Sequence, residues 1–433
     1  MSRNLLITYL CISLSAMSHA QQYQSLSRHM GADSLNHLGG VDYEVSYGSN
    51  TINTAILYGA VFKTEISRDV LENITAKSMR QNRAGYDGGG TLWYRWKHGR
   101  ADSHLKDTIP AVRFSFVSLG TREHIDAVFS KDALLLIAQG NKQFAGRTAE
   151  VGDLRLQILR YTQLRYGQIW KTKRYTAGAG ISGLIGHQYF NATAAEARLF
   201  TSDIGDSLHA TALGQMRRSD TAAKVYFDPN GIGLSLDLYI ETSFDLFSKN
   251  RYQGRVAFEL SDIGFIWWDN KSLRMEVDGE YAWSGFEAAD ITKITDSLIN
   301  AQRPTKVQNQ LVNHNDKGSY TISTLPRIAV YYSEQLSERW YAAFGLQHRL
   351  FAGQLPMFTA TESFLLKASK KSNPKLVLHQ ALGGYNLLSV GAGFEIQPGN
   401  FNIQVGMRNL PATILAGRLA GFNAYLLLSS GYR

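Results

Sequence analysis

Apolar and polar residues alternate strictly in several short segments of the chain. In residues 234–241 every even position is Leu or Ile, whereas the odd positions are Ser, Asp, Tyr and Glu. The same alternation recurs in residues 273–280, 340–350, 390–397 and 401–408. A period of two residues predicts β-strands that have one apolar face and one polar face.

Further strands are expected in other segments, many of them long. They are residues 51–61, 91–98, 111–119, 154–166, 175–189, 208–216, 253–260, 327–332, 376–383 and 422–432. A tilted strand needs about 9–11 residues to cross a bilayer, whereas strands of ordinary globular proteins are mostly about 5–6 residues long. Single-chain bacterial barrels have even strand numbers, so we expect about 14 strands, with 12–16 as the range.

The alternation fits two kinds of fold. A soluble β-sandwich turns its apolar faces to a core, whereas a membrane barrel turns them to lipid and lines its lumen with the polar faces. The length and number of the strands favour the barrel, and a sheet in lipid has to close because open edges leave backbone groups unsatisfied. We therefore expect an all-β fold, a transmembrane antiparallel β-barrel, with a soluble exported β-protein as the weaker alternative.

The first twenty residues differ from the rest of the chain. Arg3 precedes an almost uninterrupted apolar run over residues 5–16, and Ser18-His19-Ala20 places small residues where signal peptidase reads the chain. This pattern predicts a secretory signal peptide over residues 1–20 and one barrel domain over residues 21–433. No later stretch has the roughly 18 consecutive apolar residues that a transmembrane helix needs.

Three segments depart from the strand pattern. Residues 122–139 have a helical appearance, with Ser130 as the N-cap of a second short helix and Gly140-Asn141 as its end. Because it is too polar to face lipid, we expect residues 122–146 to form a short plug-like helical insertion at or in the lumen. Residues 290–318 predict a long external loop, and residues 87–90, Asp followed by three glycines, predict a turn.

Several local strings resemble a known family. They are residues 130–134, 140–146, 262–268, 285–287, 390–394 and 407–410. Together they resemble an uncharacterised family of Bacteroidota outer-membrane β-barrel proteins, a domain of unknown function that is distantly similar to fatty-acid-channel-type barrels. The resemblance implies the fold and an outer-membrane location, and it implies no activity and no catalytic residues. One departure is that Arg433 follows Tyr432, where such barrels often end on an aromatic residue.

Charged side chains occupy the polar faces of several predicted strands. The candidate lumen-facing residues are Asp237, Glu241, Arg255, Glu259, Arg274, Glu276, Asp278, Glu280, Glu395, Gln404 and Arg408. Since both signs are mixed, a lumen filled with ion pairs and water is favoured over a selective pore lining.

The sequence contains no motif that indicates catalysis. It has no Gly-x-Ser-x-Gly elbow, His-Glu-x-x-His pair, P-loop or calcium loop, and its histidines are dispersed. The only cysteine, Cys11, lies in the predicted signal peptide, which excludes thiol chemistry and disulfides from the expected mature protein. We therefore expect no enzyme, no catalytic, cofactor-binding or metal-binding residues, and no cofactor.

The net charge of +9 does not indicate nucleic-acid binding, because the basic residues are scattered and form no run with aromatic residues. Basic residues at a barrel rim can pair with lipopolysaccharide phosphates. The expected partners are outer-membrane lipid and lipopolysaccharide, the barrel-insertion machinery, and an unknown solute or secreted protein.

The function expected from these features is a passive outer-membrane channel for a small or hydrophobic solute. The alternative is a scaffold in the outer membrane that does not transport and that anchors or hands over a secreted partner.

Overall fold

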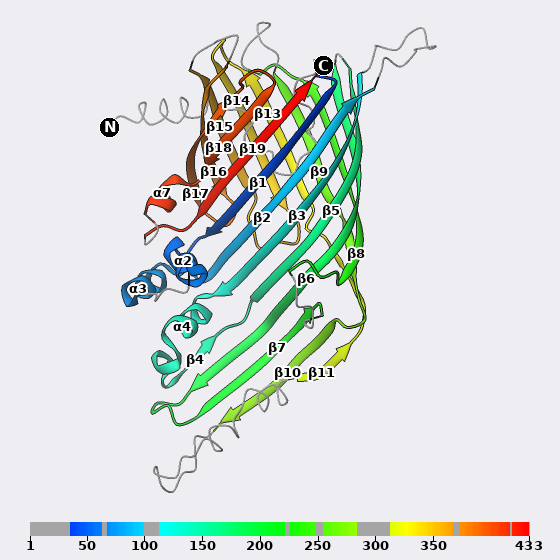
Figure 1. Cartoon of the computed structure of the whole chain (residues 1–433). Coiled ribbons are helices and arrows are strands. Elements are labelled where there is room, and N and C mark those ends of the chain that lie inside the picture. Colours follow the sequence, from blue (N-terminus) through cyan, green and yellow to red (C-terminus); the bar gives the residue numbers. More distant parts are fainter. Residues whose placement is uncertain are drawn as a thin grey trace, which may run out of the picture.

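The protein forms a closed β-barrel from which a smaller sheet projects (Figure 1). The structure, a computed structural model, describes residues 35–62, 67–98, 112–172, 174–220, 226–246, 254–283, 312–366, 372–415 and 418–432. The predicted signal peptide and residues 290–311 of the predicted long loop lie outside these ranges.

Fourteen antiparallel strands make up the barrel ring, and the pairing of the first with the last closes it. In ring order they are β1 (His37–Ser49), β2 (Gln81–Lys97), β3 (Val112–Ser130), β5 (Leu154–Lys171), β6 (Tyr175–Thr201), β8 (Gly231–Ser243), β9 (Arg255–Trp268), β13 (Arg327–Gln335), β14 (Trp340–Arg349), β15 (Met357–Leu365), β16 (Lys375–Gly383), β17 (Leu388–Ile396), β18 (Phe401–Met407) and β19 (Phe422–Tyr432). Short β12 (Tyr320–Ser323) pairs with β9 just before β13 does. The predicted barrel and its preferred strand number are confirmed.

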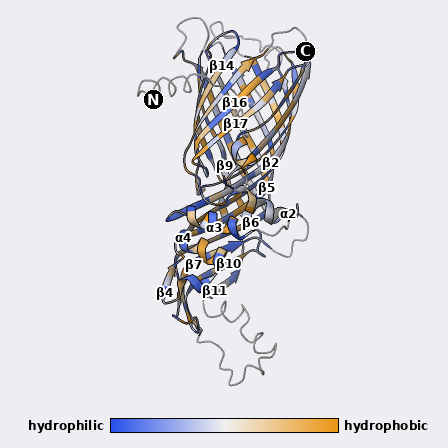
Figure 2. Cartoon of the chain, turned by 90° about the vertical axis from the view of Figure 1, so that its left-hand side faces the viewer, coloured by the Kyte–Doolittle hydropathy of each residue, from blue (hydrophilic) through white to orange (hydrophobic). Residues whose placement is uncertain are grey.

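The two faces of the wall differ in polarity, as the alternation predicts. On β8, Leu234, Leu236 and Leu238 are 40–52% exposed on the outside, whereas Asp237 between them is 1% exposed in the lumen. Figure 2 shows the same mixture of hydrophobic and hydrophilic residues along the strands of the ring. An apolar outer wall around a polar lumen is the arrangement of barrels that cross a bilayer.

The projecting sheet, here called the extension, grows out of β6. Residues 175–186 of this strand pair with β8 in the ring, whereas residues 190–201 pair with β7 (Leu208–Arg218). Then follow β10 (Leu273–Trp283) and β11 (Val312–Lys317), and β4 (Arg147–Glu150) pairs with the other edge of β6. The extension lies below the ring in Figure 1, at the end opposite to the C-terminus.

Helices lie at the same end of the ring. They are α2 (Thr54–Phe62), α3 (Arg68–Lys77), α4 (Lys131–Gln139), the 3-10 helix η2 (Asn141–Phe144) and α7 (Leu410–Ile414). In the part of the chain that the structure describes, none of these helices has the length and hydropathy needed to span a bilayer.

The predicted helical insertion is present but shorter. Residues 122–130 belong to β3, and helix α4 begins only after Ser130, whose Oγ accepts from the Ala133 amide at 3.1 Å as an N-cap. Gly140, with φ +76°, ends the helix as expected. Leu134 packs with Phe129 and α3 in a small core, on the face of β3 opposite to the lumen. The insertion therefore lies beside the outer face of the wall.

Two further expectations are wrong. Residues 51–61 were expected as a strand, but residues 54–62 form α2, since an apolar run of that length fits a helix equally well. Residues 87–90 were expected as a turn, but they lie inside β2, where a Cβ atom at Gly89 would lie 2.3 Å from the Thr121 carbonyl oxygen of β3.

Candidate functional site

Buried side chains fill much of the lumen. An apolar cluster lies towards the end of the ring that carries the termini. Its buried members are Phe114, Phe116, Ile169, Tyr239 and Ala257. They come from β3, β5, β8 and β9, so this cluster covers a third or so of the inner circumference. Any solute path through the barrel has to pass beside it.

An ionic layer follows towards the extension. The Arg165 guanidinium lies 2.7 Å from the Asp237 carboxylate and 3.3 Å from that of Asp262. Gln163 donates to Asp262 at 2.9 Å, and Arg327 donates to Glu259 at 2.8 Å. Charges removed from water in this way are tolerated only when they are paired and hydrogen-bonded.

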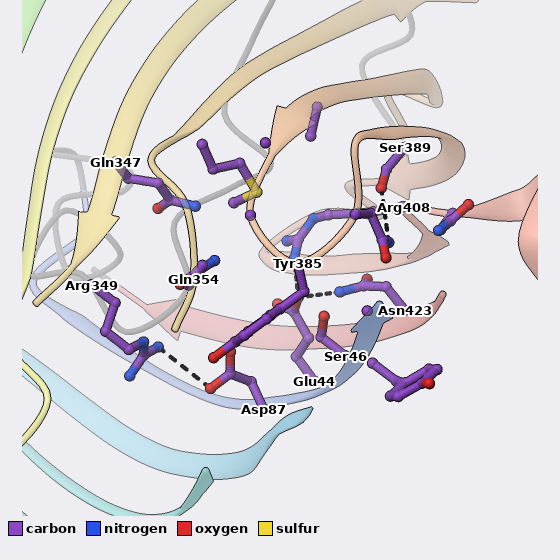
Figure 3. Close-up of a pocket in the computed structure, with 18 of the residues that line it drawn as sticks. Glu44, Ser46, Asp87, Gln347, Arg349, Gln354, Tyr385, Ser389, Arg408 and Asn423 are labelled. Carbon is purple, nitrogen blue, oxygen red and sulfur yellow. Dashed lines mark hydrogen bonds and ion pairs between the residues drawn. The ribbon is translucent and has the colours of Figure 1, made fainter. Parts of the chain in front are cut away.

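One ion pair spans the lumen. The Arg349 guanidinium of β14 lies 3.6 Å from the Asp87 carboxylate of β2, and His124 of β3 contacts both residues. In a ring of 14 strands β2 and β14 are seven positions apart, so they are opposite walls. Figure 3 shows Arg349 directed at Asp87 across the interior. The lumen is therefore closed at this level.

Asp126 fastens two loops over this ion pair. Its carboxylate, on a residue that is 1% exposed, accepts from the Gly353 amide at 2.8 Å and from the Tyr385 hydroxyl at 2.7 Å. Arg155 of the adjacent strand donates to it at 2.9 Å. Gly353 lies in the β14–β15 loop and Tyr385 in the β16–β17 turn, so both connections fold inward to reach β3. We call this arrangement the Asp126 latch.

A glycine makes room for the latch. A Cβ atom at Gly85 of β2 would lie 2.1 Å from the Tyr385 ring, so a larger residue cannot occupy this position without moving the ring. Burial and the neighbouring carboxylates raise the pKa of Tyr385 well above its usual value, which keeps its hydroxyl protonated as the donor to Asp126.

Two cavities lie on either side of the β14–β15 loop, residues 350–356. The inner one has a volume of about 130 Å³ and is bordered by Asp87, Arg349, Tyr385 and Arg408. The outer one is a cleft of about 850 Å³ between the barrel mouth and the extension. Gln354 lines both, so this single loop separates them.

The structure places the predicted lumen residues in two groups. Those on ring strands form ion pairs or lie beside them, and those on β10 lie on the extension. In the first group, Glu241 pairs with Arg255 at 3.0 Å, and Glu395 pairs with Lys375 at 3.0 Å. Arg408 pairs with Glu44, and Gln404 lies opposite Glu395 in register. The ion pairs of Asp237 and Glu259 are those of the ionic layer described above.

The β10 residues require a correction, because among the described strands β10 pairs only with β7 and β11 and is not part of the ring. Arg274, Glu276, Asp278 and Glu280 therefore do not line the lumen. Glu276 and Asp278 line the outer cleft, and Glu280 lies 3.5 Å from His209 of β7. A sheet with one wet face has the same alternation as a barrel wall, so the pattern could not separate the two cases.

The residues of the latch and of the cross-lumen pair were not predicted. His124 and Asp126 were assigned to a helix, and Asp87 to a turn. Their strand character was detectable, since the polar His124 and Asp126 alternate with the apolar Ile125 and Ala127. Among the described residues, no group of three or more His, Asp or Glu side chains could hold a metal ion.

Solved structures with related architecture have low sequence identity to this chain. The monoaromatic hydrocarbon channel TodX, as a deltaS2 mutant, is 9% identical with a TM-score of 0.38, covering 92% of this chain and 90% of that one. The translocator domain of the autotransporter NalP from Neisseria meningitidis is 8% identical with a TM-score of 0.33, covering 92% and 88%. The toluene transporter TodX from Pseudomonas putida is 10% identical with a TM-score of 0.30, covering 97% and 98%.

Among curated proteins the sequence has no match. Residues 111–407, from the first ring strand after β2 to the end of β18, match the family described as "Family of unknown function (DUF5723)". The expected membership of a barrel family of unknown function is thereby confirmed, and the chain belongs to the DUF5723 family.

Proposed function

We propose that this chain is an outer-membrane protein whose barrel is a gated channel for a small polar solute. The observation that carries the proposal is a pair of cavities, one inside the closed ring and one at its mouth, separated by one loop that the buried Asp126 carboxylate fastens. A barrel that served only as an anchor would need no fastened loop between two cavities.

The orientation follows from the lengths of the connections. At the end with the termini, the connections over residues 172–174, 336–339 and 397–400 are three or four residues long, and those over residues 98–111, 244–254 and 366–374 are 9 to 14 residues long. The connections at the other end contain the helices and the extension. Outer-membrane barrels have short periplasmic turns and longer extracellular loops. We therefore assign the extension and the outer cleft to the cell surface.

The class of solute follows from the lining. A permeating molecule would meet Glu276 and Asp278 in the cleft, and then Arg349 and Asp87 beyond the loop. A hydrophobic solute would have to displace water from these groups without replacing their hydrogen bonds, which is unfavourable. A small polar or charged solute can exchange hydrogen bonds with them.

Conductance of the purified barrel in planar bilayers tests the proposal. In Asp126→Ala the Gly353 amide and the Tyr385 hydroxyl lose their acceptor, so the loops should open and the open time should rise at least tenfold over the wild type. Glu72→Ala on α3 removes a side chain that is 57% exposed and forms an ion pair with the 90% exposed Arg68, so this variant should behave like the wild type. If both the wild type and Asp126→Ala are folded, as judged by heat-modifiable gel mobility, but never conduct, the channel is refuted.

A second candidate function is a scaffold for a secreted protein. It is favoured by the extension, whose end strand β11 pairs with β10, while no other described strand pairs with it. Such an edge can accept a further strand from a partner. A photo-reactive residue in place of exposed Asp316 should then cross-link a second protein in outer membranes, and recovery of the barrel alone would count against this function.

A further inference from the structure

Apolar side chains protrude from the extension-side rim of β16–β19. They belong to the β16–β17 turn, to the first residue of β17, and to the loop between β18 and β19 that contains α7. Their exposed fractions are 57% for Leu387, 65% for Leu388, 75% for Ile414, 48% for Leu415 and 40% for Leu419. We call these five residues the apolar shelf.

The shelf is held in place from its inner side. Asn409 caps α7 by accepting from the Ala412 amide at 3.4 Å, and Ala412 is 2% exposed. The Thr54 amide donates to the Leu419 carbonyl at 3.1 Å, and the Thr54 hydroxyl donates to the Gly421 carbonyl at 2.9 Å. These bonds fix the backbone so that Ile414 and Leu415 remain turned away from the protein.

The shelf continues the apolar outer wall. Leu388 is the first residue of β17 and lies on the same face of that strand as Val390, which is 44% exposed. Leu382 of β16, Val405 of β18 and Leu428 of β19 are outward-facing and 39–59% exposed. In Figure 1, α7 stands at the left-hand margin of the ring beside β17.

The outer wall on β3 and β5 has a different surface. On β3 and β5 the outward residues Glu123 and Arg160 form an ion pair at 3.5 Å, and the Tyr226 hydroxyl donates to Glu123 at 2.9 Å. The Arg160 guanidinium also lies 3.6 Å above the Tyr226 ring. Polar groups of this kind mark a surface in contact with water or lipid headgroups, and the five shelf residues on the side of β16–β19 have no such ion pair among them.

We propose that the apolar shelf inserts into the outer leaflet at the boundary between acyl chains and headgroups. The occupant is lipid, because the shelf is contiguous with a wall that the bilayer covers, and a protein there would have to displace lipid from β16–β18. The inference rests on the membrane placement in the proposed function, but not on channel activity.

The insertion connects the bilayer to the inner cavity. Arg408 and Asn409, which line that cavity, directly precede α7 in the chain. Lipid contacts that restrain Ile414 and Leu415 therefore also restrain the first residues of this loop. Arg408 is one of them, so it remains paired with Glu44.

Fluorophore labelling in vesicles tests the inference. Cysteine is introduced as Ile414→Cys in a chain that also carries Cys11→Ser, labelled with an environment-sensitive dye, and reconstituted in phosphatidylcholine vesicles with nitroxide lipids. Ile204→Cys is the matched control, because Ile204 is 84% exposed in the β6–β7 connection at the far end of the extension. Val405→Cys on the outer wall reports whether the barrel spans the bilayer.

The expected result is at least a twofold loss of fluorescence at Ile414→Cys with a nitroxide near the headgroup, a blue-shifted emission, and no quenching at Ile204→Cys. Quenching at Val405→Cys without quenching at Ile414→Cys would overturn the shelf and leave the barrel placement intact. Absence of quenching at Val405→Cys would overturn both. A further outcome would also overturn the inference. If the label at Ile414→Cys is not quenched, and energy transfer between labelled copies persists on lipid dilution, the shelf binds a second copy of the chain.

Discussion

Removal of Arg349 should reveal how much the cross-lumen ion pair contributes to barrel stability. In Arg349→Gln the Asp87 carboxylate loses the guanidinium at 3.6 Å, while the Arg349 site is only 10% exposed. Removing one partner of a buried ion pair costs about 3–5 kcal/mol, because the other charge remains in a poorly solvated place. His124 still contacts Asp87, so we expect the lower end, about 3 kcal/mol, or a roughly hundredfold larger unfolding constant.

The assay is equilibrium unfolding of the refolded barrel by guanidinium chloride in vesicles, followed by tryptophan fluorescence. Removing both charges, in Asp87→Asn with Arg349→Gln, should recover more than half of the loss, since no unpaired charge then remains. Arg68→Gln on α3 is the control, because its side chain is 90% exposed and its ion pair with Glu72 is screened by water. A cost for Arg349→Gln no greater than for Arg68→Gln would refute the view that this pair holds opposite walls together.

Three further predictions concern single elements. Gly85→Ala should displace the Tyr385 ring and lengthen the open time as Asp126→Ala does. Gly183→Ala, whose Cβ would meet nothing within 4 Å, should have the open time of the wild type, and equal open times in the two variants would contradict the packing argument. Ser130→Ala should remove the N-cap of α4 and destabilise this helix by about 1 kcal/mol. Amide hydrogen exchange should become faster in residues 131–136, whereas exchange in β3 should not change. Neutralising Glu276 and Asp278 together should lower the cation-to-anion permeability ratio about thirtyfold per charge, because a unit charge about 4 Å away attracts a cation by about 1 kcal/mol in water and repels an anion by about as much. Reversal potentials in a salt gradient measure this ratio. Glu280→Gln, outside the cleft lining, should leave the ratio unchanged, and a change there would show that the cleft is not the path.

The alternation of β8 was sufficient to predict which residues face lipid and that Asp237 faces inward, because each ring strand has one dry and one wet face. The same argument failed for β10, since a sheet in water with one packed face has the same period. It also could not pair Arg349 with Asp87, because residues 262 positions apart meet only when the ring has closed. The Asp126 latch was missed for a local reason: β3 runs without a break into α4, and the helix was extended back through the strand.

The continuity of β6 has a mechanical consequence. Its 27 residues reach about 90 Å at the rise of a β-strand, from the end of the ring that carries the termini to the tip of the extension. The pairing with β7 shifts register between Ala194 and Glu196, and such a bulge bends a strand without interrupting it. A force on the tip of the extension is therefore carried as shear by the many hydrogen bonds that join β6 to β5 and β8, and not by a flexible hinge. The extension should respond to a pull as a stiff lever fixed in the wall.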